Sequence, residues 1–118
     1  MTLKYFDLSE FDDPTLPNSG LNMDTDFLSK LEEAREIAGL PFRITSGYRT
    51  KDHNQEVGGV PNSSHLIGVA SDIAVSSGSE RYTILNALIK AGFKRIGVAK
   101  TFIHCDTDPN KPNSVWTY

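Results

Sequence analysis

The sequence predicts an α+β domain in which helices pack against a small, mostly antiparallel central sheet. Two long stretches carry apolar residues at helical spacing, and four short stretches are rich in β-formers. The 118 residues leave room for one domain, placed at 1–118, whose core can be large enough to be stable without disulfides. Prolines, aspartates and a glycine are scattered through residues 1–22, so we expect an irregular lead-in there.

The first helix is expected to begin at Asp24 or Thr25, either of which can cap it. Gly39 can close this helix, and Pro41 prevents its continuation. Its apolar residues recur at steps of one, three and four, which places them on one face of the helix. These predicted core residues are Phe27, Leu28, Leu31, Ala34 and Ala38.

A second long helix is expected over 77–92 and a short one over 50–57. Ser77-Gly-Ser-Glu80 fits a capping box at the start of the long helix, and Gly92 can end it. Gly58 and Gly59 can close the short helix. The residues of the long helix predicted to face the core are Tyr82, Ile84, Leu85, Leu88 and Ile89.

Strands are expected over 42–46, 69–75, 94–98 and 101–107. Because side chains alternate along a strand, Asp72 lies on one face of its strand between two alanines. The same rule places His104 and Asp106 together on one face of the last strand, with Cys105 pointing the other way as a core thiol. If the apolar faces meet the helices, both strands present their polar side chains to the same side.

Composition restricts the classes of partner and the compartment. Twelve basic and fifteen acidic side chains give a net charge of −3 without any basic stretch, which argues against nucleic acid as a partner. No apolar run approaches the roughly 20 residues that span a bilayer, so no membrane partner is expected. The first residues lack the features of a signal peptide. We therefore expect a monomer made in the cytoplasm, which would need release or delivery to act outside the cell.

Three side chains form a candidate metal site: His65, Asp72 and His104. Two histidines and a carboxylate are the donors that a catalytic zinc uses when its fourth position stays open for water. Structural zinc sites usually take four ligands, several of them cysteines in close pairs. Because Cys105 is the only cysteine, a structural site is disfavoured. The expected cofactor is one Zn²⁺ per chain.

Two further residues are candidates for contact with a substrate. Arg49 follows Ser46-Gly-Tyr48, and its guanidinium can hold a carboxylate or an oxyanion with two hydrogen bonds. The plain alternative is a solvated arginine at the start of a helix. His53 can line or cap the short helix, or it can contact substrate.

Four motifs together resemble the zinc D-alanyl-D-alanine carboxypeptidase family, especially its short single-domain members from phages and prophages. They are Ser46-Gly-Tyr-Arg49, His53-Asn-x-x-Val-Gly-Gly59, Ser63-x-His65-x-x-Gly68-x-Ala70-x-Asp72 and His104-x-Asp106. The resemblance spans roughly residues 5 to 107. It implies a fold shared with D-Ala-D-Ala dipeptidases and the hedgehog signalling domain, with a central antiparallel sheet and helices on one side.

The resemblance also implies residue roles and a substrate class, the D-amino-acid peptides of bacterial peptidoglycan. It makes His65, Asp72 and His104 the zinc ligands, Arg49 the arginine for substrate or transition state, and Ser63 a hydrogen-bond donor to substrate.

In one respect the sequence departs from the pattern of that family. Enzymes of this family typically carry an acidic general base three residues before the second histidine, where this chain has Thr101. A threonine cannot act as a base near neutral pH. Asp106 can take over the catalytic role or only orient His104. Glu56 is a further acid to consider.

The predicted function is therefore that of a zinc metallopeptidase that hydrolyses amide bonds in peptidoglycan peptides, as a D-Ala-D-Ala carboxypeptidase or an endolysin-like endopeptidase. The alternative, favoured by Thr101, is a zinc-stabilised but inactive cell-wall-binding or virion module on the same fold.

Overall fold

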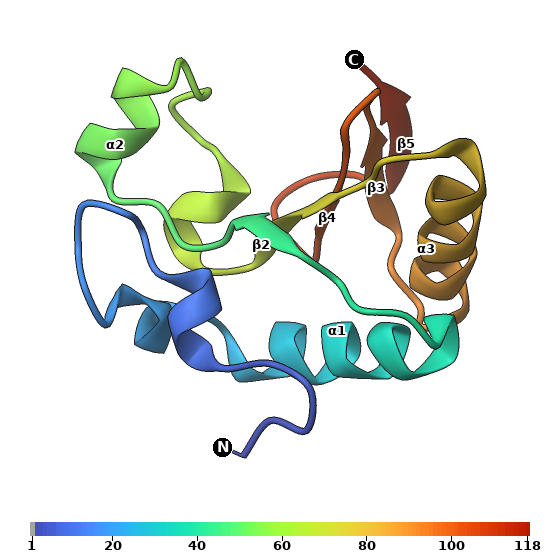
Figure 1. Ribbon diagram of the computed structural model, residues 1–118. Coiled ribbons are helices and arrows are strands. Elements are labelled where there is room, and N and C mark those ends of the chain that lie inside the picture. Colours follow the sequence, from blue (N-terminus) through green and yellow to red (C-terminus); the bar gives the residue numbers. More distant parts are fainter. Residues whose placement is uncertain (1) are drawn as a thin grey trace.

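The computed structural model describes residues 2–118, which form one five-stranded sheet and three α-helices (Figure 1). The sheet order is β1-β2-β4-β3-β5. The helices are α1 (Thr25–Ala38), α2 (Lys51–Glu56) and α3 (Gly78–Lys90). The strands are β1 (Ile44–Ser46), β2 (Ala70–Ala74), β3 (Arg95–Val98), β4 (Phe102–Asp106) and β5 (Ser114–Thr117). The predicted α+β class is confirmed.

The sheet is mixed rather than antiparallel throughout. β1–β2, β2–β4 and β3–β4 are antiparallel, but β5 pairs with β3 in parallel. No strand was predicted for Ser114–Thr117, because this short edge strand is largely exposed and lacks a buried apolar face. The loop after β4 contains Pro109 and Pro112, and it carries the chain past β3 to the far edge of the sheet.

The core lies between the sheet and the pair of helices α1 and α3, which pack against each other. Ile73 and Ile103 on the central strands are fully buried there. The expected inward positions of Tyr82 and Ile89 are wrong, since these side chains are 70% and 55% exposed. Each residue turns an α-helix by about 100°, so Tyr82 lies about 200° around the axis from the fully buried Ile84.

Local capping signals explain where the helices begin and end. The Asp24 carboxylate accepts from the backbone N–H of Phe27, and Gly39 ends α1 with a φ of 68°. Ser77 accepts from the backbone N–H of Glu80, as a capping box requires. The Glu80 carboxylate, however, accepts from the N–H of Ser76 rather than Ser77, so only half of the predicted box forms.

The lead-in contains two 3₁₀ turns, η1 (Leu8–Phe11) and η2 (Ser19–Asn22), and buries Phe6 and Phe11 against the core. None of the helices in residues 2–118 is long and apolar enough to cross a bilayer.

The sheet face opposite α1 and α3 is the polar one, and one row of residues crosses four of its strands. Asp72 pairs directly with His104, His104 with Gly97, and Gly97 with Trp116, so these four residues form one row across β2, β4, β3 and β5. The predicted alternation is thereby confirmed for β2 and β4. The segment that contains α2 and a third 3₁₀ turn, η3 (Ser64–Ile67), stands apart from α1 and α3 in Figure 1.

Candidate metal centre

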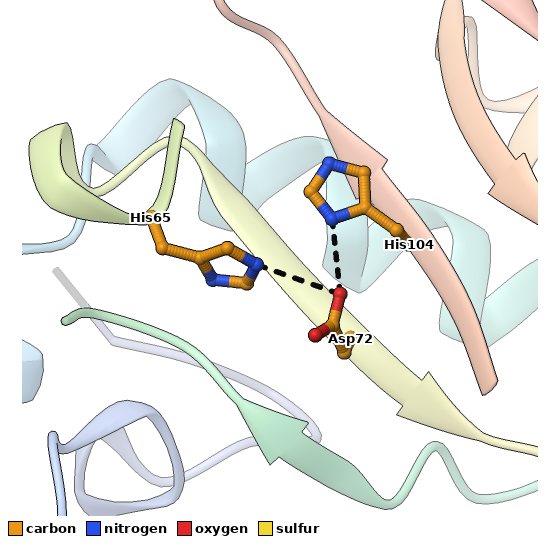
Figure 2. A group of neighbouring side chains, drawn as sticks. All are labelled: His65, Asp72 and His104. Carbon is orange, nitrogen blue, oxygen red and sulfur yellow. Dashed lines mark hydrogen bonds and ion pairs between the residues drawn. The ribbon is translucent and has the colours of Figure 1, made fainter. Parts of the chain in front are cut away.

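His65, Asp72 and His104 converge at one point of this polar face, as Figure 2 shows. Asp72 and His104 come from the middles of paired strands, and His65 comes from η3. Asp72 Oδ1 lies 2.9 Å from His104 Nδ1 and 3.5 Å from His65 Nε2. One donor atom from each of the three residues lies within 4.8 Å of the others.

The two residues that flank the turn η3 hold His65 in place. The Ser63 hydroxyl accepts from the backbone N–H of His65, and Gly68 ends the turn with a φ of 74°. A Cβ on Gly68 would also lie 2.3 Å from the carbonyl oxygen of Asn22. Both the positive φ and the close approach require glycine. The spacing Ser63-x-His65-x-x-Gly68 is therefore a structural requirement for delivering the histidine.

Hydrogen bonds on the far side of each ring determine which nitrogen faces Asp72. His65 Nδ1 donates to the carbonyl oxygen of Gly47 at 2.7 Å, because a carbonyl can only accept. His104 Nε2 lies 2.7 Å from Asp106 Oδ2. The remaining nitrogens, Nε2 of His65 and Nδ1 of His104, face the Asp72 carboxylate. Such outer hydrogen bonds fix the tautomers of metal-binding histidines.

The donor set fits a zinc ion. Ligands at about 2.0–2.1 Å from a tetrahedral zinc lie about 3.3 Å from one another. The separations of 2.9 and 3.5 Å that Asp72 Oδ1 makes with the two histidines bracket this value. Two imidazole nitrogens and one carboxylate leave the fourth position open, which is the pattern of a catalytic rather than a structural site.

Asp72 and His104 each stabilise the charged form of the other. Burial alone would raise the pKa of Asp72, but hydrogen bonds from His104 and His65 outweigh it and hold this pKa far below its usual range. Burial would lower the pKa of His104, whereas its bonds to Asp106 and Asp72 raise it. A metal ion takes the place of protons at such a site.

Asp106 is enclosed behind His104 and is only 1% exposed. Its Oδ2 contacts His104, and its Oδ1 accepts from Arg95 Nε at 2.8 Å and from the backbone N–H of Asp108 at 3.1 Å. Burial would raise the pKa of Asp106, but these hydrogen bonds and the two neighbouring cations lower it. Because both oxygens are engaged, the geometry favours the orienting role over the role of general base.

Arg49 lies on the other side of Asp72 and lines the cavity described below. Its Nη2 lies 3.6 Å from Asp72 Oδ2. Nε donates to the Ser46 hydroxyl and Nη1 to Asn54 Oδ1, both at 3.1 Å. The guanidinium is thus held at the metal centre by groups from β1, β2 and α2.

A cavity of about 470 Å³ lies over the centre. The loop after α2 forms one wall with residues Val57–Val60, and the side chains of Phe102, Trp116 and Tyr118 form another. Among the residues that the structure describes, the only carboxylates lining this cavity are those of Asp72 and Asp106.

Trp116 is a site residue that sequence reasoning missed. Its ring centroid lies 5.5 Å from that of His104, and the Arg95 guanidinium stacks on it at 4.9 Å. Gly97 makes this possible, because a Cβ there would lie 2.5 Å from the indole Nε1. Trp116 is the only tryptophan of the chain, and this was the signal that could have indicated the wall.

The structure brings some predicted residues to the cavity and leaves others outside. Ser63 lines the cavity, and its hydroxyl hydrogen remains free to donate because the oxygen accepts from His65. His53 is not among the lining residues, and its Nδ1 is buried 4.0 Å from Glu56. Its position therefore does not support the predicted contact with substrate. Glu56 and Thr101 are exposed and also lie outside the lining.

A family model described as Peptidase M15 matches residues 5–106. The chain belongs to the peptidase M15 family. This match confirms the predicted family, which is of the zinc D-Ala-D-Ala carboxypeptidase type. Because members of the family depend on zinc, the triad is the candidate metal site of an M15 peptidase. A comparison with curated proteins found no match.

Proposed function

We propose that this M15 chain hydrolyses amide bonds in peptidoglycan peptides and binds one zinc ion per chain through His65, Asp72 and His104. The observation that carries the proposal is the convergence of these donors with Arg49 at the base of one cavity. The resemblance to D-Ala-D-Ala carboxypeptidases supports this substrate class, and with it a proposed site of action at the bacterial cell wall.

The residues around the triad have distinct roles in this proposal. Zinc bound there supplies a Lewis acid that polarises a peptide carbonyl and makes water a better nucleophile. Arg49 binds a substrate carboxylate or the developing oxyanion, for which a planar guanidinium is suited. Asp106 holds His104 in its orientation, and Ser63 donates a hydrogen bond to the substrate. We assign His53 no role in binding.

Digestion of purified peptidoglycan, followed by mass spectrometry of the soluble products, tests the proposal. We expect new amino termini to appear, to disappear with a chelator, and to return when zinc is added. The His65→Ala protein is the matched control, because it lacks one donor and should release nothing. Release of reducing sugars that is insensitive to the chelator would instead indicate a glycosidase.

A second candidate is an inactive, zinc-stabilised wall-binding or virion module. The observation that favours it is the lack of a disengaged carboxylate among the described lining residues, where Asp106 is bonded through both oxygens. For this module we expect no products from peptidoglycan, together with zinc-dependent co-sedimentation with it.

A further inference from the structure

A buried asparagine on α2 connects Arg49 to the loop that walls the cavity. Asn54 is 3% exposed. Its Oδ1 accepts from Arg49 Nη1 at 3.1 Å, and its Nδ2 donates to the carbonyl oxygen of Val60 at 2.9 Å. An arginine can only donate and a carbonyl can only accept, so one orientation of the carboxamide satisfies both partners.

The loop after α2 is shaped around this carboxamide. The backbone N–H of Gly59 donates to the carbonyl oxygen of Asn54 at 2.8 Å. A Cβ on Gly59 would lie 2.0 Å from Asn54 Oδ1 and 3.1 Å from Arg49 Nη1. Only glycine allows the loop to approach so closely. The orientation of Arg49 and the position of the cavity wall are therefore set by the same side chain.

Asn54 also balances the pull of Asp72 on the guanidinium. Of the three groups that hold Arg49, Asp72 carries the negative charge, and it is a proposed metal ligand. The other two are the Ser46 hydroxyl and the Asn54 carboxamide. Without Asn54, Nη1 of Arg49 has no acceptor on α2. Only the hydrogen bond from Nε to Ser46 would then restrain the guanidinium against its attraction to Asp72. The hydrogen bonds to Ser46 and Asn54 use two of the five N–H groups of Arg49, so three N–H groups are left for Asp72 and a ligand while this geometry holds.

We propose that Asn54 is a positioning residue that aims the Arg49 guanidinium into the cavity, toward a carboxylate or oxyanion of the substrate. The inference rests on the proposed function for its catalytic consequence, and on geometry alone for the restraint of Arg49. Asn54 itself does not line the cavity, so it acts through the arginine.

A double-mutant cycle tests the catalytic consequence. We compare wild type with Asn54→Ala, Arg49→Ala and the double variant. Each protein is brought to the same zinc content and assayed well below its own melting temperature. We expect Asn54→Ala to lower kcat/KM for wall peptides by about 10-fold, the cost of losing one hydrogen bond to a charged group. In the Arg49→Ala background the same change should have no further effect. Equal losses in both backgrounds, or no loss in either, would overturn the proposal.

The control for α2 is Gln55→Ala, at an exposed neighbour that does not line the cavity. It should keep wild-type kinetics. If Asn54→Ala does not fold, Asn54→Leu removes both hydrogen bonds while keeping most of the volume, and the same expectations apply to it.

Nitrogen NMR of the Arg49 guanidinium provides a readout that does not need turnover. Rotation about the Cζ–Nη1 bond should be slow in wild type, several-fold faster in Asn54→Ala, and unchanged in Gln55→Ala. Asn54→Asp keeps the acceptor for Arg49 but loses the donor to Val60, so rotation should stay slow there. If wild type cleaves no wall peptide, the proposed function fails while this measurement still decides the restraint. Unchanged rotation in Asn54→Ala would show that Asn54 does not hold the arginine.

Discussion

Replacing Gly97 by alanine should displace the tryptophan that covers His104. The new Cβ would lie 2.5, 2.7 and 2.9 Å from three atoms of the Trp116 indole, and ordinary contact begins near 3.4 Å. The ring must therefore move by roughly 1 Å. Overpacking costs about 1–3 kcal/mol in a closed core. Trp116 is half-buried on an edge strand and can yield, so we expect a cost near the lower limit.

A loss of about 1 kcal/mol corresponds to a fall of about 4 °C in the melting temperature of a domain of this size. Trp116 is the only tryptophan, so its fluorescence reports the displacement directly, and its emission should shift to the red. Zinc affinity should weaken by up to about 10-fold, because His104 loses a packing partner that helps to orient it.

Gly78→Ala is the matched control. A Cβ at Gly78 meets nothing within 4 Å, and its φ is not positive. Stability should stay the same or rise slightly, because alanine is the better helix former. A Gly97→Ala protein with wild-type melting temperature, emission and zinc affinity would refute the view that Gly97 is needed for the approach of Trp116 to His104.

Four further predictions concern the metal centre and the lead-in. Metal analysis should find one zinc per wild-type chain and little in His65→Ala or His104→Ala, and full occupancy in both variants would rule out these ligands. Arg49→Lys should keep zinc and melting temperature but lose on the order of 10²-fold in peptide turnover, since lysine lacks the planar fork of the guanidinium. Full activity would show that Arg49 does not hold the substrate with two hydrogen bonds. Asp106→Asn should weaken zinc binding by about 10–100-fold if it orients His104, whereas a rate loss of about 10²–10⁴-fold with zinc retained would identify a general base. Burial would raise the pKa of Asp13, but hydrogen bonds from Thr15 and Thr50 lower it. The Asp13 carboxylate therefore stabilises the fold at neutral pH, and this stabilisation is lost as pH falls through the lowered pKa. The difference in melting temperature between wild type and Asp13→Asn should therefore shrink below about pH 4, and a constant difference would show that the charge of Asp13 does not stabilise the fold.

Local patterns in the sequence were enough to predict most of the fold. The Asp24 cap, the Gly39 stop and the apolar stripe of α1 all depend on contacts within a few residues. The short edge strand β5 left no such pattern. Its pairing with β3 depends on the loop that places it there. The apolar Tyr82 and Ile89 misled the prediction for α3, because hydrophobicity alone does not say which side of a helix its neighbours cover.

The donor types and strand alternation determined that Asp72 and His104 face the same side, since period-2 alternation is a local property of each strand. Only the tertiary structure decided which histidine nitrogens face Asp72, that Asp106 is enclosed, and that Asn54 restrains Arg49. Gly47 and His65, or Gly97 and Trp116, approach each other across distant parts of the chain. Such contacts follow from the packing of the whole domain, and no repeat in the sequence encodes them.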